Sequence, residues 1–391
     1  MSVDTGITYA AFPQAEHRAR LAQARALLAQ AGIDFCISMA PENLYYYGGY
    51  DSWVSVNSPQ AMVFATAGGE PAIMLRDTDI SLVRETSWIT DVRAYRLMAD
   101  DVPGLIAALA CEKGLSGGKV GIEVQSYAVP YALGNRIAHA IAPADIVDVT
   151  GLLGMPRLIK SPTELGFLRT AGGYAAKGIE AARRAAKPGM TEIELAGEVE
   201  HAMRAAGSDY WSIPTELASG DRTAGGHATA RERVMQSGDL VHMEFAGVCK
   251  RYHATAVHTF SLGDPGQRAR DIYALGQASL AAGIAAVRPG VCVADVEEAS
   301  LVPLRAHGLE EAATMRFGYG IGAAYPPIWL EPLQIARGSD QILEPGMVFV
   351  LHGYLQLIEE KLGVIVGGTY HLGHDGLEMI AGTGEMDLEI L

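Results

Sequence analysis

The sequence predicts an α/β (α+β) protein with two domains, a small α/β domain over residues 1–155 and a larger domain over residues 156–391. Three observations support this prediction. The chain has 391 residues, of which 49% are hydrophobic, and this is enough to fill two ordinary cores. Helical and strand patterns alternate along the first part of the chain. The second part contains a helical unit with a Pro-Gly turn that occurs twice.

The first domain opens with an amphipathic helical pattern, HRARLAQARALLAQA, over residues 17–31. The short strands expected after it cover residues 35–39, 61–65, 72–75, 120–123 and 146–149. Strands that alternate with helices are typical of α/β layers. A new helical pattern begins within RLIKSPTEL, after a proline-marked turn, and places the domain boundary near residue 155.

The second domain contains a weak internal repeat. AAKPGMTEIELAGEVEHAMRAAG surrounds Pro188, and AAVRPGVCVADVEEASLVPLRAHG surrounds Pro289. In each stretch a helical pattern meets a Pro-Gly turn, and a second helix begins two or three residues later. We interpret the two stretches as a duplicated supersecondary unit.

Composition excludes several classes of partner. A net charge of −15 and a pI near 5.2 oppose binding to nucleic acid or to anionic lipid. No long apolar run suits a membrane span, and the first residues do not resemble a secretion signal, so we expect a cytoplasmic protein with a small-molecule substrate. The four cysteines are scattered without CxxC spacing, which gives no indication of a disulfide framework or a thiolate zinc site.

His227 is the leading catalytic candidate. It lies in ASGDRTAGGHATA, a run of small, polar and glycine residues that is typical of a loop. Imidazole titrates near neutrality and can take a proton from water and hand it to a leaving nitrogen. Glu244 is the second candidate, because a carboxylate between the apolar neighbours of LVHMEFAGV is costly unless it has a partner.

The strand that follows, YHATAVHTF, carries two histidines of which only one can face the site. Alternation puts His258 on one face and His253 with Thr255 on the other. Alternation does not say which face is inward, so His253, Thr255 and His258 are all substrate-binding candidates. The family resemblance described below implies that Thr255, and with it His253, faces the site, and a strand bulge would exchange the two histidines.

The segment GYGIGAAYPPIWLE is expected to form an ordered loop, because its prolines and glycines oppose a regular helix. Aromatic faces beside a carboxylate suit a cationic ligand. The substrate-binding candidates here are Tyr319, Tyr325, Trp329 and Glu331. His352, after the apolar strand MVFVL, is either a second imidazole of the pocket or a core residue.

Together with these features, the stretches GDLVHMEFAGVCKRYHATAVHTF, FGYGIGAAYPPIW and EPGMVFVLHGYL resemble the methionine aminopeptidase and prolidase superfamily. The resemblance covers essentially the whole chain. It implies a small creatinase-like α/β domain followed by a pseudo-symmetric pita-bread domain, in which helices cover a curved antiparallel sheet.

The resemblance also implies a change in the metal site. The family holds two metal ions with two Asp, one His and two Glu, and the matching positions here are Glu244, Thr255, Tyr319, His352 and Gly367. Two close cations need several anionic oxygens, so we expect no metal and no other cofactor. A single metal held by Glu244, His258 and His352 remains open.

Within the superfamily, the chain looks most like the metal-free creatinase branch, and GYGIGAAYPPIWLE is similar to the corresponding stretch of ectoine hydrolases. This similarity gives His227 the role of general acid/base. It also implies a homodimer in which Tyr50 and Trp53, from the loop over residues 43–58, close the partner's site. Creatine-degrading enzymes clamp the substrate carboxylate with arginines and hold its guanidinium with two glutamates. This chain has no Arg or Lys between Tyr45 and Leu75, and this loss argues against creatine as the substrate. The two glutamate positions become Val257 and His352.

These features predict a metal-independent hydrolase that cleaves a non-peptide C–N bond of an amidine, lactam or amide in a small nitrogenous metabolite. His227 and Glu244 are its catalytic residues. Three alternatives stay open: a lyase or isomerase on the same scaffold, a mono-metal peptidase of the Xaa-Pro type, and a non-catalytic binding protein.

Overall fold

A computed structural model describes residues 8–384 and 387–391 of the chain. The chain divides into two compact units, residues 1–157 and residues 158–391. Strands and helices occur in both, so the expected α/β (α+β) class is confirmed. In the part of the chain that the structure describes, none of the helices is long and apolar enough to cross a membrane.

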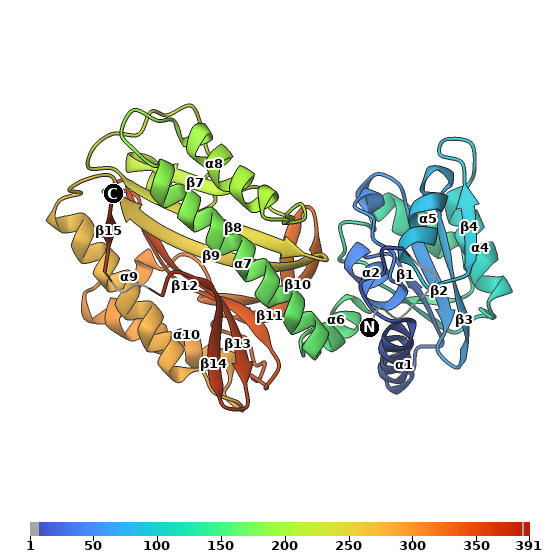
Figure 1. The fold of residues 1–391 in the computed structure, drawn as a ribbon. Coiled ribbons are helices and arrows are strands. Elements are labelled where there is room, and N and C mark those ends of the chain that lie inside the picture. The colour runs from blue at the N-terminus through green and yellow to red at the C-terminus, as the bar shows by residue number, and fades with distance from the viewer. Residues whose placement is uncertain (1–7, 385–386) are drawn as a thin grey trace. The chain divides into compact units, whose positions relative to one another are not determined.

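Over its described residues, the amino-terminal unit is a six-stranded sheet with helices on both faces (Figure 1). Its strands follow the order β4-β3-β2-β1-β5-β6, in which β1, β2 and β3 pair antiparallel and the other neighbours pair parallel. The elements are α1 (Gln14–Gln30), β1 (Phe35–Ser38), α2 (Pro41–Gly48), β2 (Ala61–Ala65), β3 (Gly68–Arg76), α3 (Ile80–Thr86), β4 (Asp91–Tyr95), α4 (Val102–Glu112), β5 (Lys119–Ile122), α5 (Tyr131–Ala140), β6 (Asp145–Asp148) and α6 (Thr150–Gly154).

Strand alternation explains why both faces of this sheet are covered. Cys36 packs in one core with residues of α1 and α2, whereas its neighbours Phe35 and Ile37 pack in a second core with α4 and α5. The helix and the strands expected from the sequence are all present, with ends shifted by a few residues.

The carboxy-terminal unit is built on a curved, nine-stranded sheet, counted over the described residues. The path β11-β10-β12-β13-β9-β8-β7 pairs antiparallel throughout, and β14 and β15 add to β13 and β9. The elements are α7 (Pro162–Ala185), α8 (Glu192–Ala205), β7 (Glu216–Ser219), β8 (Leu240–Cys249), β9 (Tyr252–Ser261), α9 (Gln267–Ala286), α10 (Val293–Ala306), β10 (Gly318–Tyr325), β11 (Ile328–Ile335), β12 (Val348–Leu357), β13 (Leu362–Gly373), β14 (Gly376–Gly382) and β15 (Glu389–Ile390).

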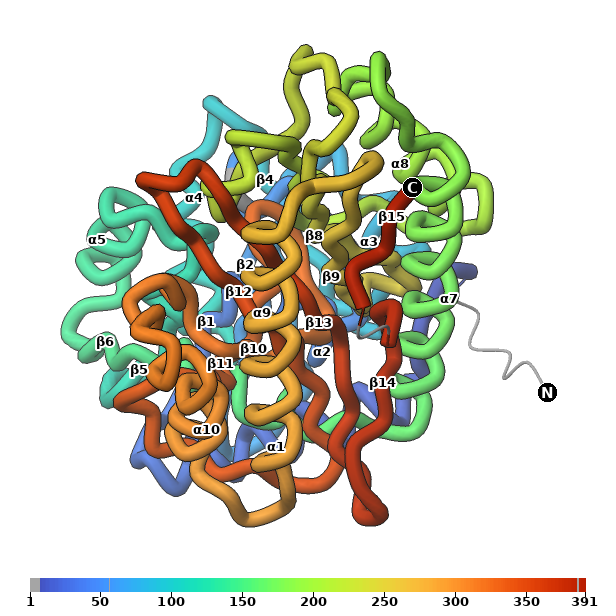
Figure 2. The backbone as a smooth tube through the Cα atoms, turned by 90° about the vertical axis from the view of Figure 1, so that its left-hand side faces the viewer, coloured from blue at the N-terminus to red at the C-terminus, as the bar shows by residue number. Residues whose placement is uncertain are grey.

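Two helix pairs cover this sheet and give the unit its internal symmetry. The pair α7–α8 packs on β7, β8 and β9, and the pair α9–α10 packs on β11, β12 and β13. Figure 2 shows α9 lying across the strands β12 and β13. Each pair is joined by the expected Pro-Gly turn, so the duplicated unit predicted from the sequence is confirmed. Ser161 and Thr191 start α7 and α8 with capping boxes.

The segment GYGIGAAYPPIWLE corrects one expectation. It forms the antiparallel strands β10 and β11 rather than an irregular loop. Its two prolines, Pro326 and Pro327, lie in the turn between Tyr325 and Ile328, outside the strand ladder, so they do not interrupt the hydrogen bonds between the strands. The hairpin therefore holds its aromatic side chains on a rigid support.

Candidate active site

A cavity of about 390 Å³ lies within the carboxy-terminal unit. Its wall combines residues of β7 and β8, the loop before β8, the β10–β11 hairpin and β12. The titratable groups on the wall are Glu216, His227, Glu244, Arg316, Tyr319 and His352. Four of these six residues, His227, Glu244, Tyr319 and His352, were candidates from the sequence, and the fold brings them together although His227 and His352 are 125 positions apart.

A chain of hydrogen bonds runs along one side of the cavity. Trp329 donates its indole N–H to the hydroxyl oxygen of Tyr319 (3.1 Å), and that hydroxyl donates to Oε1 of Glu244 (2.5 Å). Burial raises the pKa of Glu244, and the hydrogen bond from Tyr319 opposes this rise. These two hydrogen bonds fix the orientation of the buried Glu244 carboxyl group.

Glu216 was missed by the sequence reasoning. It pairs with Glu244 in the β7–β8 register, so both carboxyl groups lie on the same face of the sheet. Burial and then the nearby charge of Glu244 raise the pKa of Glu216 to about 8. The only signal in the sequence was a carboxylate at the start of the four-residue strand ELAS, and nothing there indicated its cross-strand partner.

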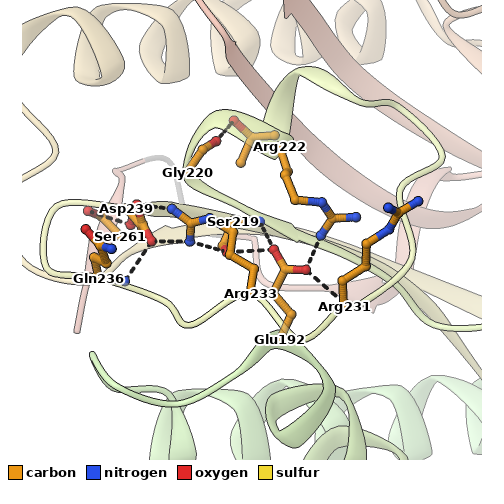
Figure 3. A network of polar contacts seen from close by, with 10 residues as sticks. Glu192, Ser219, Gly220, Arg222, Arg231, Arg233, Gln236, Asp239 and Ser261 are labelled. Carbon is orange, nitrogen blue, oxygen red and sulfur yellow. Dashed lines mark hydrogen bonds and ion pairs between the residues drawn. The ribbon is translucent and has the colours of Figure 1, made fainter.

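His227 lies in a turn after η4 (Gly220–Ala224), and its side chain is exposed at the cavity. The expected loop is therefore present. Glu192 is fully buried at the start of α8. It holds the chain segment that precedes His227, because it accepts hydrogen bonds from the amide (2.9 Å) and the hydroxyl (2.7 Å) of Ser219. Arg222 donates to the other oxygen of the same carboxylate (Figure 3).

The chain segment that follows His227 is bonded to the same network (Figure 3). The amide of Arg231 donates to Glu192 (3.0 Å), and Arg233 donates to Asp239 (2.5 Å) and to the hydroxyl of Ser219 (2.7 Å). The loop is thus anchored on both sides of the histidine, and an exposed side chain acquires a defined position.

His352 lies on the cavity wall and is only 3% exposed. Burial, and then the positive charge of Arg316, lower its pKa to about 4, so the ring is neutral at pH 7. Its Nδ1 atom has no hydrogen-bond partner among the described residues. Of the two alternatives expected for His352, its location on the cavity wall agrees with that of an imidazole of the pocket.

Several other candidates lie outside the residues that line the cavity. Glu331 forms an ion pair with Lys160 (2.5 Å), and both side chains are buried. This pairing explains how a carboxylate is accommodated in β11, and it removes Glu331 from the set of groups that face the cavity. Tyr325 ends β10, with its ring 6.0 Å from the guanidinium carbon of Arg251.

The two histidines of β9 are separated, as strand alternation predicts. His253 lies on the face that carries Glu244, with its ring centroid 6.2 Å from that of Trp329, and its Nε2 accepts from the amide of Ser212 (3.1 Å). His258 points to the opposite face, where its Nε2 contacts Glu389 (2.9 Å). His258 is therefore not brought to the cavity.

Thr255 lies on the same face of β9 as His253, but it is fully buried and does not line the cavity, and its amide donates to Oγ1 of Thr369 (2.7 Å). In the amino-terminal unit, Tyr50 is buried and accepts a hydrogen bond from Gln60 (3.1 Å), while Trp53 is 61% exposed. The role of Tyr50 and Trp53 in closing a partner's site stays a prediction.

The residues present at this site do not suit the binding of two metal ions. Over residues 8–384 and 387–391, no group of three His, Cys, Asp or Glu residues could hold an ion. The set Glu244, His258 and His352 is divided between two faces of the sheet. Gly367, at the position of the last glutamate ligand, has φ +151°, and a Cβ there would lie 2.0 Å from the carbonyl oxygen of Leu351. No side chain fits at that position.

Comparison with known proteins agrees with this architecture. Residues 166–376 match the model of metallopeptidase family M24, and residues 20–159 match the creatinase/prolidase N-terminal domain. The first match covers more than half of the chain. The chain belongs to metallopeptidase family M24. Its M24 domain therefore has the pita-bread fold that the sequence motifs implied.

Relatives of this M24 protein carry different activities in their names. The ectoine hydrolase of Halomonas elongata is 28% identical over 95% of this chain and 96% of its own length. The probable dipeptidase PepE of Mycobacterium tuberculosis is 28% identical over 84% of this chain and 85% of its own. The solved structure of an Xaa-Pro dipeptidase from Bacillus anthracis is similar in fold, with a TM-score of 0.84 and 22% identity over 96% of this chain and 100% of that one.

Proposed function

We propose that this M24 protein is a metal-independent hydrolase that cleaves a non-peptide C–N bond in a small nitrogenous metabolite, with His227 as general acid/base. The observation that supports it most is the location of His227 on the same cavity as Glu244, Tyr319 and His352. The similarity to a protein named ectoine hydrolase supports a substrate other than a peptide.

In the proposed mechanism, Nε2 or Nδ1 of His227 takes a proton from water, and the oxygen of that water forms a bond to the unsaturated carbon. Polar groups of the wall hold the tetrahedral adduct, whereas the hydroxyl proton of Tyr319 is already donated to Glu244. The imidazolium of His227 then protonates the leaving nitrogen as the C–N bond breaks. Proton and oxygen both come from one water molecule, so the reaction is a balanced hydrolysis.

The cavity volume also suits a small substrate. About 390 Å³ is near the lower end of the volumes of ligand pockets, which suits a small compound.

We further propose a homodimer in the cytoplasm, with the loop of Tyr50 and Trp53 reaching the partner's cavity.

The test is metal analysis of the purified protein combined with a screen of ectoine-like, creatine-like, lactam and hydantoin compounds. We expect hydrolysis that survives dialysis against a chelator and falls by a factor of about 10² to 10⁴ in His227→Ala. His201→Ala is the matched control, because His201 is exposed on α8 and should leave the rate unchanged. A His227→Ala variant with full activity would remove the proposed acid/base.

The second candidate is a peptidase of the Xaa-Pro type, which the similarity to a probable dipeptidase favours. It requires a metal to polarise the peptide carbonyl. Hydrolysis of an Xaa-Pro dipeptide that appears on addition of Zn²⁺, Mn²⁺ or Co²⁺ and disappears with chelator would favour it over the first proposal.

A further inference from the structure

A separate pocket, here called the outer pocket, lies on the opposite face of the carboxy-terminal sheet. Its volume is about 310 Å³, and the described residues that line it all differ from those of the cavity of His227. Helix α9 and strand β13, which lie against each other in Figure 2, provide most of its wall. His258 of β9 also lines it, on the face of the sheet opposite to Glu244. The strands therefore separate the outer pocket from the proposed catalytic residues.

Small side chains give the outer pocket an opening to solvent. Ala281 and Ala285 of α9 line it and are exposed. Deeper in the wall, His258 and Tyr370 are only 2% and 8% exposed. A ligand that enters past the two alanines therefore meets buried polar side chains.

Two polar groups of these buried side chains are left without a protein partner. Nε2 of His258 donates to Glu389 (2.9 Å), and this hydrogen bond lowers the pKa of Glu389, so the carboxylate is an ionised acceptor. In the part of the chain that the structure describes, neither Nδ1 of His258 nor the hydroxyl of Tyr370 has a hydrogen-bond partner. Buried polar groups are nearly always hydrogen-bonded, so these two indicate a polar ligand.

The rest of the wall suits an uncharged ligand. Among the described residues that line the outer pocket, none is Asp, Glu, Lys or Arg. A charged group buried against such a wall would lose its hydration without gaining an ionic partner. Leu280, Ile284 and Val366 present hydrocarbon side chains, and Gln277 donates to the hydroxyl of Tyr273 (2.9 Å).

We propose that the outer pocket binds a small neutral compound that carries hydroxyl groups, which bond to Nδ1 of His258 and to the hydroxyl of Tyr370. A hydroxyl group both donates and accepts, so it matches the ring nitrogen as well as the tyrosine. The hydrocarbon part of the compound lies against the apolar wall. The compound is not the substrate, since neither His227 nor Glu244 lines the outer pocket, and its binding does not depend on the proposed function.

The volume of the outer pocket sets the size of the compound. An engineered protein cavity of about 150 Å³ holds one benzene molecule. The outer pocket has about twice that volume, so a compound of two fused rings fills it. The naphthalene skeleton is therefore a suitable probe.

Fluorescence titration of the full chain with 2,6-dihydroxynaphthalene tests this proposal, because the emission of a naphthol changes when it leaves water. Naphthalene, which lacks the hydroxyl groups, and naphthalene-2-carboxylate, which is charged, are added as competitors. We expect one molecule of the diol to bind per chain. Naphthalene should bind about ten times more weakly, because it leaves both polar groups unpaired, and the carboxylate more weakly still.

Two variants assign the binding to the outer pocket. Tyr370→Phe should weaken the binding of the diol about threefold to tenfold and should not weaken that of naphthalene. Ala281→Phe should abolish the binding of both, because the ring fills the opening. Ala274→Phe is the matched control, since it makes the same change at an exposed position of α9 that does not line the outer pocket. Melting curves check that the variants are folded.

The proposal is overturned if the diol does not bind, or if Ala281→Phe leaves its binding intact, which would place it elsewhere. Equal affinity for naphthalene, an unchanged affinity in Tyr370→Phe, or tighter binding of the carboxylate would overturn it as well. His227→Ala separates this site from the proposed function, since it should lower hydrolysis and leave the binding of the diol unchanged.

Discussion

The hydroxyl of Tyr319 donates a 2.5 Å hydrogen bond to Oε1 of Glu244, and it is the one described side chain that the structure bonds to this carboxyl group. The interaction joins the β10–β11 hairpin to β8, and it lowers the pKa of Glu244 against the effect of burial. Because this hydrogen bond favours the ionised form of Glu244, its removal should raise the pKa of Glu244.

We therefore expect Tyr319→Phe to shift the acidic limb of the pH–rate profile to higher pH. Hydrogen bonds to charged groups contribute about 1.5–3 kcal/mol, so the shift should be about one to two pH units. The measurement is kcat/KM between pH 5 and pH 9. Tyr370→Phe is the control, because Tyr370 lies on β13 outside this cavity. An unshifted limb would show that Tyr319 does not set the charge of Glu244.

Glu216 should make stability depend on pH. A carboxyl group with a raised pKa binds more protons in the folded state than in the unfolded state. Its contribution is therefore fully present below its ordinary pKa of 4.5 and is lost as pH rises towards about 8. In Glu216→Gln this loss is absent, so the variant should gain thermal stability over the wild type as pH rises from 5 to 9. Paired melting curves across this range measure the effect, and a difference that does not vary with pH would contradict it.

The buried ion pair of Lys160 and Glu331 should be costly to break from one side. Lys160→Met or Glu331→Gln leaves an uncompensated buried charge, and each should lower the free energy of unfolding by about 3–5 kcal/mol. The double variant Lys160→Met/Glu331→Leu should recover much of this loss. Urea denaturation measures it, with Arg268→Ala, which removes an exposed ion pair with Glu360, as a control expected to cost less than about 1 kcal/mol. Additive losses in the double variant would refute the coupling.

Glu192 should act on catalysis through the position of His227. Glu192→Ala removes the hydrogen-bond acceptor for the segments on both sides of His227. We expect kcat to fall by a factor of about 10² while KM changes little. Glu192→Gln keeps one oxygen acceptor and should restore part of kcat. Steady-state kinetics and melting curves separate this from unfolding, with Glu198→Ala as the control. A Glu192→Ala variant that melts early but retains kcat would mean a purely structural role.

Much of the fold was accessible from the sequence because local patterns determine it. The Pro-Gly turns at Pro188 and Pro289 fix the ends of two helix pairs, and the alternation of His253 and His258 correctly predicted that they face opposite sides of β9. The segment with Pro326 and Pro327 was harder, because prolines oppose a strand only when they lie inside its ladder.

The candidate site was accessible only in part, because cavities depend on contacts between distant segments. His227, Glu244 and His352 were found from motifs, but Glu216 gains its significance from a strand register that no local pattern encodes. Glu331 looked available for a ligand because its partner Lys160 is 171 residues away in the sequence. Arg316 was missed for the same reason: it is an ordinary charged residue until the fold places it beside His352.

The tight backbone around Gly367 limits which substitutions this position accepts. A single mutation that placed a glutamate there would bring its Cβ to 2.0 Å from the carbonyl oxygen of Leu351, so the two strands could not keep their present separation. Movement of β12 would have to accompany the substitution. A carboxylate ligand at position 367 therefore requires at least two changes, the substitution itself and a second one that moves β12 away from β13.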